Sequence, residues 1–470
     1  MADSLTPIAA YDTLRQLAGG RSFLFESAPA AGQAARYSII GLGACAELRV
    51  TNAAMLLSID GAIVRRDLPT GAKVLAAARS MVNAVKPSQA ELEASPLLGA
   101  YGAASFELAG YFERLPQLSR NDDPMPDLHL VVPETVVVFD HFTHELTMSS
   151  FAGTQRLEQI RSVLESARVP ALADGRELCS VYAVAAPIAY ADAVDQAKEA
   201  IYAGEAFQIV LARHWSATMS ATPFDAYRAL RAINPSPYMY FLELGWGELF
   251  GSSPELLATV NQGRARIRPL AGTRARGAHL ADDARLARQL KRDPKERAEH
   301  LMLVDLGRND LARVCAAGSV RVNELLSVER YSHVMHLVSD IVGDLRPECD
   351  AFDLFAAAFP AGTVSGAPKI RAMELIAQLE GRRRGFYAGS VCRFGFDGSL
   401  DACITLRSAH VYDDLFHLSA GAGIVAASDP ERENAECAAK AQVLIAALER
   451  ASAGHAFQAP VRAQEEAHAR

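Results

Sequence analysis

The stretch PKERAEHLMLVDL, from Pro294 to Leu306, has the pattern of a helix, and we expect that helix to end at Gly307. Glu296 and Glu299 stand three residues apart within it. Because residues at positions i and i+3 share one face of a helix, the two carboxylates can be aimed at a single point. The stretch therefore predicts half of an acidic site on a helix.

A second acidic pair, Glu433 and Glu436, stands near the C-terminus in another helix-like run, which Ser428 or Asp429 can cap. Four convergent carboxylates suit a hard cation. Mg²⁺ is the natural candidate, because it keeps several waters and is usually completed by an anionic substrate. The alternative is an ordinary solvated helix, on which Glu436 and Lys440 would form a surface ion pair.

Composition places the 470-residue chain among globular proteins, with 50% apolar and 22% charged residues. A net charge of −8 does not indicate the excess of basic residues that is typical of nucleic-acid-binding proteins. The N-terminus lacks a basic start followed by an apolar core, and no stretch approaches the roughly 18 apolar residues of a membrane span. Seven cysteines without a CxxC pair argue against a disulfide framework and a thiolate zinc site. We expect a cytoplasmic protein with reduced thiols that binds neither nucleic acid nor membrane.

Short strand-like runs alternate with helical ones, which predicts an α+β architecture. The strand-like runs of the first part are Ser22 to Glu26, Arg36 to Ile40 and Glu134 to Asp140. Between about Val169 and Pro187 the sequence turns to Ala, Pro, Gly and Asp, which indicates a boundary between two lobes. We expect an N-terminal lobe over residues 1–175, a second domain over residues 185–450 and a frayed tail over residues 451–470.

The run from Phe207 to Arg213 alternates as a strand, with Gln208 and Val210 on the face opposite Ile209. Gln208 is thus aimed away from its apolar neighbours.

Three glycine-bearing segments could be loops that bring bare backbone to a ligand, or tight turns. They are Pro269 to Thr273, Gly362 to Lys369 and Ala420 to Gly423. The middle segment is no nucleotide-binding loop, because its glycine spacing is too short and Lys369 follows proline.

Three further side chains are candidates for chemistry. His336 lies in a strand-like apolar context, where a buried structural histidine is the default, although beside an anionic substrate it could move a proton at cellular pH. Glu255 follows a turn, and Arg407 follows an apolar run on a predicted strand. Singly, each of them is only suggestive.

Taken in order, these segments resemble the chorismate-utilising enzymes, and among them the anthranilate synthase component I family. The resemblance is dense over residues 190–445 and looser in the first lobe. Its segments are Gly204 to Leu211, Asn234 to Phe241, Gly251 to Glu255, Ala271 to Arg274, Glu299 to Leu311, His333 to Ser339, Gly362 to Lys369, Gly421 to Glu436, Ser22 to Ser27, Arg36 to Ser38 and Val138 to His141. It implies the fold of that family, two lobes built on largely antiparallel sheets flanked by helices.

The resemblance also implies an activity, a lyase reaction in which chorismate is aminated at C2 with ammonia and pyruvate is eliminated. The product is anthranilate, at the first step of tryptophan biosynthesis. In this interpretation Mg²⁺ is held by Glu299 and Glu436, and Glu296 and Glu433 fix waters on or beside the ion.

Catalytic and binding positions follow from the same resemblance. Glu255 would be the general acid that protonates the C4 oxygen, since hydroxide is a poor leaving group, and His336 would serve pyruvate elimination. Tyr387 and Arg407 would hold the enolpyruvyl carboxylate. The rest of the pocket would be formed by Gly272, Thr273, Thr363, Gly421, Ala422, Gly423 and Lys440.

Two positions discriminate among relatives. Relatives that add water to chorismate carry lysine at the place of Gln208, whereas ammonia already has a lone pair and needs no such base. Aminodeoxychorismate synthases typically carry a nucleophilic lysine at the place of Ala271. The pattern therefore favours anthranilate synthase over aminodeoxychorismate synthase. A catalytically silent, tryptophan-binding relative is a third possibility, against which the retained catalytic residues speak.

The resemblance implies two partners besides the substrate. Nothing in the chain resembles a glycine-flanked nucleophilic cysteine followed by a distant His and Glu, so we expect ammonia from a separate glutamine amidotransferase subunit, anthranilate synthase component II. Tryptophan is the expected feedback inhibitor. Glu26 would take its amino group, while Ser27 and the backbone around Pro237, Tyr238 and Met239 would enclose the rest.

Overall fold

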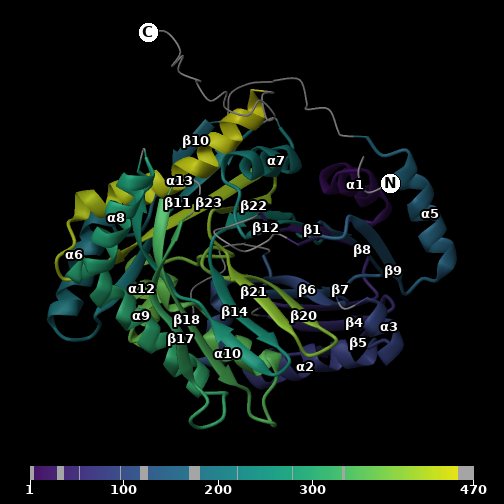
Figure 1. Cartoon of the computed structure of the whole chain (residues 1–470), viewed down its shortest axis with the longest axis horizontal. Coiled ribbons are helices and arrows are strands. Elements are labelled where there is room, and N and C mark those ends of the chain that lie inside the picture. The colour runs from purple at the N-terminus through teal and green to yellow at the C-terminus, as the bar shows by residue number, and fades with distance from the viewer. Residues whose placement is uncertain are drawn as a thin grey trace.

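The structure is a computed structural model (Figure 1). It describes residues 5–28, 36–51, 53–95, 97–116, 125–168, 180–219, 221–277, 279–330 and 334–453. Two large sheets built from antiparallel strand pairs stack on each other, and helices lie on the outer side of each sheet (Figure 1). This arrangement confirms the predicted α+β fold class.

The first sheet has the strand order β10 (Ser180–Ala183), β11 (Gln208–Thr218), β23 (Leu415–Ile424), β22 (Ser408–Tyr412), β13 (Glu248–Ser253), β12 (Tyr238–Glu243), β1 (Ser22–Glu26), β2 (Tyr37–Leu42), β8 (Thr135–Asp140) and β9 (Glu145–Ser150), with β19 (Gly366–Ala367) paired to β11.

The second sheet has the order β16 (Leu270–Ala275), β18 (Val334–Asp344), β15 (Arg264–Ile267), β14 (Leu256–Asn261), β21 (Leu400–Ile404), β20 (Ser390–Gly395), β6 (Gly99–Ala104), β7 (Leu128–Val132), β3 (Ala46–Val50), β4 (Met55–Ile59) and β5 (Ala62–Asp67), with β17 (Arg321–Arg330) paired to β18.

The helices divide between the two outer faces. On the first sheet pack α1 (Pro7–Leu14), α5 (Thr154–Glu165), α6 (Tyr190–Tyr202), α7 (Pro223–Ile233), α12 (Lys369–Glu380) and α13 (Pro430–Ser452). On the second pack α2 (Gly71–Ala84), α8 (Leu280–Arg292), α9 (Pro294–Ala312) and α10 (Ala351–Ala358). Short helical turns are η1 (Arg15–Leu17), α3 (Gln89–Ala94), η2 (Phe106–Leu108), α4 (Ala109–Phe112) and α11 (Gly362–Ser365).

Strand alternation explains why both faces of the first sheet are buried. Phe23 and Tyr240 point into the core between the sheets, whereas their chain neighbours Leu24 and Phe241 point into the core under the helices. Successive side chains of a strand face opposite sides, so each strand serves two apolar layers. The result is a helix, sheet, sheet, helix stack.

Strands from both parts of the chain share each sheet. Residue Ser22 of β1 pairs with Glu243 of β12, and Gly99 of β6 pairs with Gly395 of β20. The parts of the chain on either side of the expected boundary are thus joined by backbone hydrogen bonds in both sheets. Their boundary stays a prediction, because residues 169–179 lie outside the described residues, as do residues 454–470 of the expected tail.

Three local expectations were wrong. Residues 270–273, expected in a loop or a tight turn, lie in the strand β16. The helix α9 does not end at Gly307 but runs on to Ala312, and the glycine lies against β18, where a Cβ would come within 2.8 Å of Cδ1 of Ile341. Residues 420–423 are no loop. They lie in β23, paired with β11 through contacts such as Gly423 with Val210.

Other local expectations are confirmed. The strand from Ser22 to Glu26 has the predicted bounds, and Asp429 caps α13 by accepting a hydrogen bond from the backbone N–H of Arg432. Gln208 begins β11, which extends to Thr218 because β10 and β23 pair with its far end.

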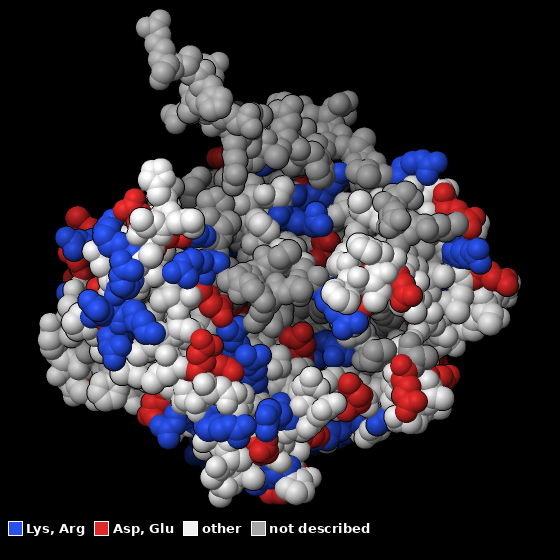
Figure 2. All heavy atoms as spheres, in the orientation of Figure 1, with Lys and Arg blue, Asp and Glu red and all other residues white. Residues whose placement is uncertain are grey.

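The surface charges, the helices and the cysteines bear on what the composition predicts. Lys and Arg side chains are interspersed with Asp and Glu over most of the face shown in Figure 2. Within the described ranges, the helices include none long and apolar enough to cross a membrane. The six cysteines described are free of disulfides, and Cys179 lies outside the described residues. The cytoplasmic location stays a prediction.

Candidate functional site

A cavity of about 520 Å³ is lined by strands of both sheets and by α9, α11 and α13. It brings together most of the side chains singled out from the sequence. Those that line it are Gln208, Glu255, Gly272, Glu296, Glu299, His336, Thr363, Tyr387, Arg407, Gly421, Gly423, Glu433, Glu436 and Lys440. Segments far apart in the chain thus converge on one site.

Two expected residues are not among the lining. Ala422 is fully buried and packs in the core under the helices, on the face of β23 opposite its neighbours Gly421 and Gly423. Thr273 lies in β16 opposite His336, and its side chain lies outside the described part of the structure.

Two polar residues that line the cavity, Lys295 and Ser419, were not predicted from the sequence. Lys295 precedes Glu296 in the first turn of α9. Ser419 precedes Gly421 by two residues on β23, so strand periodicity would have placed it on the same face. That signal was lost because the glycines were interpreted as a loop.

Glu255 and Arg407 lie on two neighbouring crossovers between the sheets. Residues 254–255 lead from β13 of the first sheet to β14 of the second, and residues 405–407 lead back from β21 to β22. The crossovers are tied together, since the N–H of Ile404 donates to the Glu255 carbonyl at 3.0 Å and that of Ser252 donates to the Arg407 carbonyl at 3.1 Å. Arg407 takes a left-handed backbone with φ of 48°. A residue strained in this way is held by its surroundings.

The Glu255 carboxyl is 6% exposed, and burial raises its pKa to about 7. The hydroxyl of Thr363 and the cations Lys440 and Arg407 oppose the rise only in part. Thr363 Oγ1 is itself buried, without a hydrogen bond of normal geometry to the described residues. Near neutral pH the carboxyl is therefore divided between its acid and its anion, which suits a proton donor.

His336 of β18 is shifted in the opposite direction by the same cause. Burial lowers its pKa to about 4, and the neighbouring Arg407 adds to the effect. Nδ1 lies 3.3 Å from the carbonyl oxygen of Gly272. A neutral ring that donates from Nδ1 carries its basic lone pair on Nε2. The ring is therefore set up as a proton acceptor at cellular pH.

Close approach explains two glycines of the cavity wall. A Cβ on Gly421 would lie 2.7 Å from the Tyr387 hydroxyl, and one on Gly423 would come even closer to Gln208 Nε2. Lys440 Nζ donates to the carbonyl of Gly421 at 2.8 Å. Burial raises the pKa of Tyr387, so its hydroxyl remains a hydrogen-bond donor.

The two acidic pairs line the same cavity from α9 and α13. Glu299 Oε1 accepts a hydrogen bond from Gln208 Nε2 at 3.0 Å, and Glu436 Oε1 pairs with Lys440 Nζ at 2.7 Å. Burial, helped by the neighbouring carboxylates, raises the pKa values of Glu296 and Glu433.

Oxygen donors of this kind fit Mg²⁺ in type. In the described part of the chain, however, no three His, Cys, Asp or Glu side chains stand close enough together to hold a metal. The half-exposed pair of Glu436 with Lys440 is the surface ion pair of the alternative interpretation. A cation would therefore compete with Gln208 and Lys440 for carboxylate oxygens.

The five residues expected to bind an effector gather at another cavity, of about 280 Å³, which is lined among others by Glu26, Ser27, Pro237, Tyr238 and Met239.

The carboxylate of Glu26 is already engaged in this second cavity. It accepts from the Tyr227 hydroxyl at 2.6 Å and from Arg231 Nε and Nη2 at 2.9 and 3.1 Å. An amino group would have to share these oxygens.

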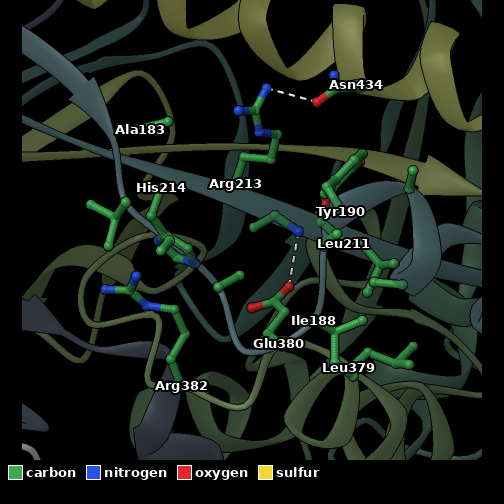
Figure 3. Close-up of a pocket in the computed structure, with 17 residues that line it drawn as sticks. Ala183, Ile188, Tyr190, Leu211, Arg213, His214, Leu379, Glu380, Arg382 and Asn434 are labelled. Atoms are coloured by element: carbon green, nitrogen blue, oxygen red, sulfur yellow. Dashed lines mark hydrogen bonds between the residues drawn. The ribbon is translucent and has the colours of Figure 1, made fainter.

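A third cavity, of about 400 Å³, lies beside β11 and holds no residue predicted from the sequence (Figure 3). Small apolar residues of the segment before α6 form much of its wall. In Figure 3 Arg213 donates to Asn434, and Glu380 accepts from the backbone of β11.

Comparison with known proteins identifies the family of the chain. The family described as chorismate binding enzyme matches residues 21–446, so the chain belongs to the chorismate-binding enzymes. Anthranilate synthase component 1 of Thermus thermophilus is 43% identical over 97% of both chains. That of Streptomyces coelicolor is 42% identical over 96% of this chain and 88% of its own. Within the family, the chain therefore belongs with the anthranilate synthase component 1 proteins.

A solved structure supports the same placement. Anthranilate synthase component I from Streptococcus pneumoniae superposes with a TM-score of 0.77 at 34% identity, covering 89% of this chain and 94% of that one.

The raised pKa of Glu255 predicts a pH-dependent stability. The folded state holds the proton up to about pH 7, whereas the ordinary value is 4.5. The stability that the protonated form contributes is therefore complete below 4.5 and is lost as pH rises to 7. Glu255→Gln, which mimics the protonated acid, should be more stable than the unchanged chain by about 1–3 kcal/mol at pH 8 and equal to it near pH 4.5.

Urea midpoints at the two pH values measure this difference. The exposed Glu158→Gln is the control and should shift neither midpoint. A stability difference for Glu255→Gln that does not change with pH would contradict the raised pKa.

Proposed function

We propose that the chain is the catalytic component of an anthranilate synthase, which converts chorismate and ammonia into anthranilate, pyruvate and water. The observation that supports this most is the pairing of Glu255, with its raised pKa, and the neutral His336 in one cavity. Loss of the C4 hydroxyl as water needs a proton donor, whereas elimination of pyruvate needs a group that takes a proton from C2. Burial supplies both an acid and a base that coexist at neutral pH.

The residues divide the reaction between them. Glu255 gives its proton to the C4 oxygen, which leaves as water while ammonia adds at C2. His336 Nε2 then takes the C2 proton as the bond between ring C3 and the enolpyruvyl oxygen breaks, which leaves the aromatic ring. The departing enolpyruvate is protonated on its methylene carbon to give pyruvate. Arg407 and Tyr387 hold the enolpyruvyl carboxylate, and Gln208 lies beside the incoming nitrogen as a neutral hydrogen-bonding group.

Mg²⁺ is proposed as the cofactor, with Glu299 and Glu436 as its ligands and Glu296 and Glu433 holding waters beside it. Bound there, the ion would neutralise the ring carboxylate of the substrate. Support comes from the convergence of two helices that each carry a carboxylate pair on one cavity.

A glutamine amidotransferase subunit is the proposed source of ammonia. The relatives are named component 1, which implies a second component, and the chain itself offers no glutaminase nucleophile in its sequence. Ala271 lines the cavity at the position where aminodeoxychorismate synthases carry a nucleophilic lysine. Without that lysine, direct amination at C2 is favoured, and with it anthranilate synthase over aminodeoxychorismate synthase.

Tryptophan is proposed as a feedback inhibitor bound in the cavity beside Glu26. Support comes from the gathering of all five expected residues there. Tyr238 of β12, at this cavity, pairs with Ser253 of β13, which lies two residues before Glu255. The effector cavity and the chorismate cavity are therefore connected through neighbouring strands.

The reaction predicts a fluorescent product. Chorismate, ammonium and Mg²⁺ mixed with the chain should yield anthranilate, glutamine should not replace ammonium, and EDTA should abolish the signal. Glu255→Gln should lower kcat by about 10²–10⁴-fold. Mass spectrometry of the product is decisive: 4-amino-4-deoxychorismate would favour the runner-up, and no turnover would favour a silent tryptophan-binding relative.

The four carboxylates should differ in importance. Glu299→Gln or Glu436→Gln should abolish Mg²⁺-dependent anthranilate formation, whereas Glu296→Gln and Glu433→Gln should cost about 10–100-fold in Mg²⁺ affinity. Titration of each variant with Mg²⁺ gives the comparison. Equal damage at all four positions would mean that the ligand assignment is wrong.

Millimolar tryptophan should inhibit anthranilate formation. Ser27→Phe, which fills the 280 Å³ cavity, should raise the concentration for half inhibition at least about tenfold. The same substitution at the exposed Ser166 is the control. If calorimetry detects no heat of tryptophan binding to the unchanged chain, the effector proposal is wrong.

A further inference from the structure

Ser419 and His214 form a polar pair at the cavity wall that the proposed reaction does not use. They are opposite residues of β23 and β11, and Ser419 Oγ lies 2.8 Å from His214 Nδ1. Ser419 lines the chorismate cavity, whereas His214 is 9% exposed and borders the third cavity on its other side (Figure 3).

The surroundings of His214 keep its ring neutral. Burial lowers its pKa well below 6.5, and the neighbouring Arg382 and Arg384 together with His410 and His417 act in the same direction. A neutral imidazole has one N–H and one bare nitrogen, so the position of the single proton decides the direction of the hydrogen bond to Ser419.

The surroundings of Nε2, the other ring nitrogen of His214, decide where the single proton resides. His214 Nε2 is buried and has no hydrogen-bond partner within the described ranges. Buried N–H groups without a partner are rarer than buried acceptors with an unused lone pair. The proton therefore resides on Nδ1, which donates to Ser419 Oγ. The serine hydroxyl, whose oxygen accepts from His214, keeps its own hydrogen for another acceptor.

The position along β23 indicates which part of a substrate that hydrogen meets. Gly423 lies beside Gln208 and hence beside Glu299, and Gly421 lies beside the Tyr387 hydroxyl. Ser419 continues the same face of the strand, roughly 13 Å from Gly423 at about 3.3 Å per residue. It is thus at the end of the cavity away from the α9 carboxylates.

We propose that Ser419 is a substrate-binding residue whose hydroxyl donates to the side-chain carboxylate of the dicarboxylate substrate, with His214 as the positioning residue that fixes it as a donor. This inference rests on the proposed function. It adds a third donor to Arg407 and Tyr387 at the enolpyruvyl end. Hydrogen bonds to ionised acceptors are stronger than those between neutral groups, so the contact bears on substrate affinity.

Steady-state kinetics separates binding from chemistry. Ser419→Ala should raise the KM for chorismate about tenfold with kcat changed by less than about twofold, the size of one hydrogen bond to a charged group. Ser419→Thr keeps a hydroxyl and should retain most of the affinity. His214→Asn keeps an amide donor and should act like the unchanged chain, whereas His214→Leu should resemble Ser419→Ala.

A double variant tests whether His214 acts through Ser419. Adding His214→Leu to Ser419→Ala should raise KM no further, because the hydroxyl that it orients is already gone. Additive losses would mean that the histidine has only a structural role and would overturn the positioning assignment.

Two inhibitors identify the carboxylate involved. Benzoate carries only the ring carboxylate, and a benzoate with an enolpyruvyl ether at C3 carries both. Ser419→Ala should weaken the second about tenfold and leave the first unchanged. Equal weakening of both, or of neither, overturns the proposal. Selective weakening in a chain that forms no anthranilate would uphold this contact and refute the proposed reaction.

Discussion

The buried ion pair of Arg384 with Glu380 holds the walls of the site in place. Arg384 binds both Glu380 oxygens and donates to the carbonyls of Val210 in β11 and Val364 in α11. Glu380 in turn accepts from the N–H of Ala212 at 2.9 Å. Both side chains are almost wholly buried. Removing one partner of such a pair leaves an uncompensated charge, at a cost of about 3–5 kcal/mol.

The pair occupies a gap in the first sheet. On its outer edge β11 pairs with β19 at Gln208 and Ile209 and with β10 from Trp215 to Thr218, so the backbone between these two stretches lacks a neighbouring strand. Polar side chains take the place of that strand and satisfy backbone groups that would otherwise be buried unpaired. The pair thus binds the backbone of β11 at Val210 and Ala212, directly beside the cavity wall.

Burial also sets the protonation states of the acid and the base within the cavity. The same loss of water raises the pKa of Glu255 to about 7 and lowers that of His336 to about 4, so at neutral pH much of Glu255 keeps its proton while His336 is neutral. The ion pair of Lys440 with the α13 carboxylate Glu436, by contrast, remains half exposed. Loss of water thus shifts the acid and the base of the cavity in opposite directions, while this ion pair stays in contact with solvent.

Sequence reasoning worked where side-chain periodicity and packing agree. The alternation that aims Gln208 at the cavity and the acidic pairs at helical spacing were both readable from the chain. Glycine was the main source of error. Gly307 was interpreted as a helix end and Gly423 as part of a loop, whereas each lies inside a regular element and against a side chain, Ile341 or Gln208, of a distant segment. Strand spacing alone would have found Ser419, had residues 420–423 been interpreted as a strand. The Arg384 pair could not be found in this way, since its role depends on which strands become neighbours.

The sharing of both sheets by distant segments has a consequence for how the chain reaches this fold. The strands β1 and β6 are made early, but their partners β12 and β20 emerge from the ribosome much later. Until then each sheet ends in an unpaired edge, which can pair with another chain as readily as with its own. Contacts of such long range also fold slowly. The architecture that unites the active site thus exposes the nascent chain to aggregation throughout most of its synthesis.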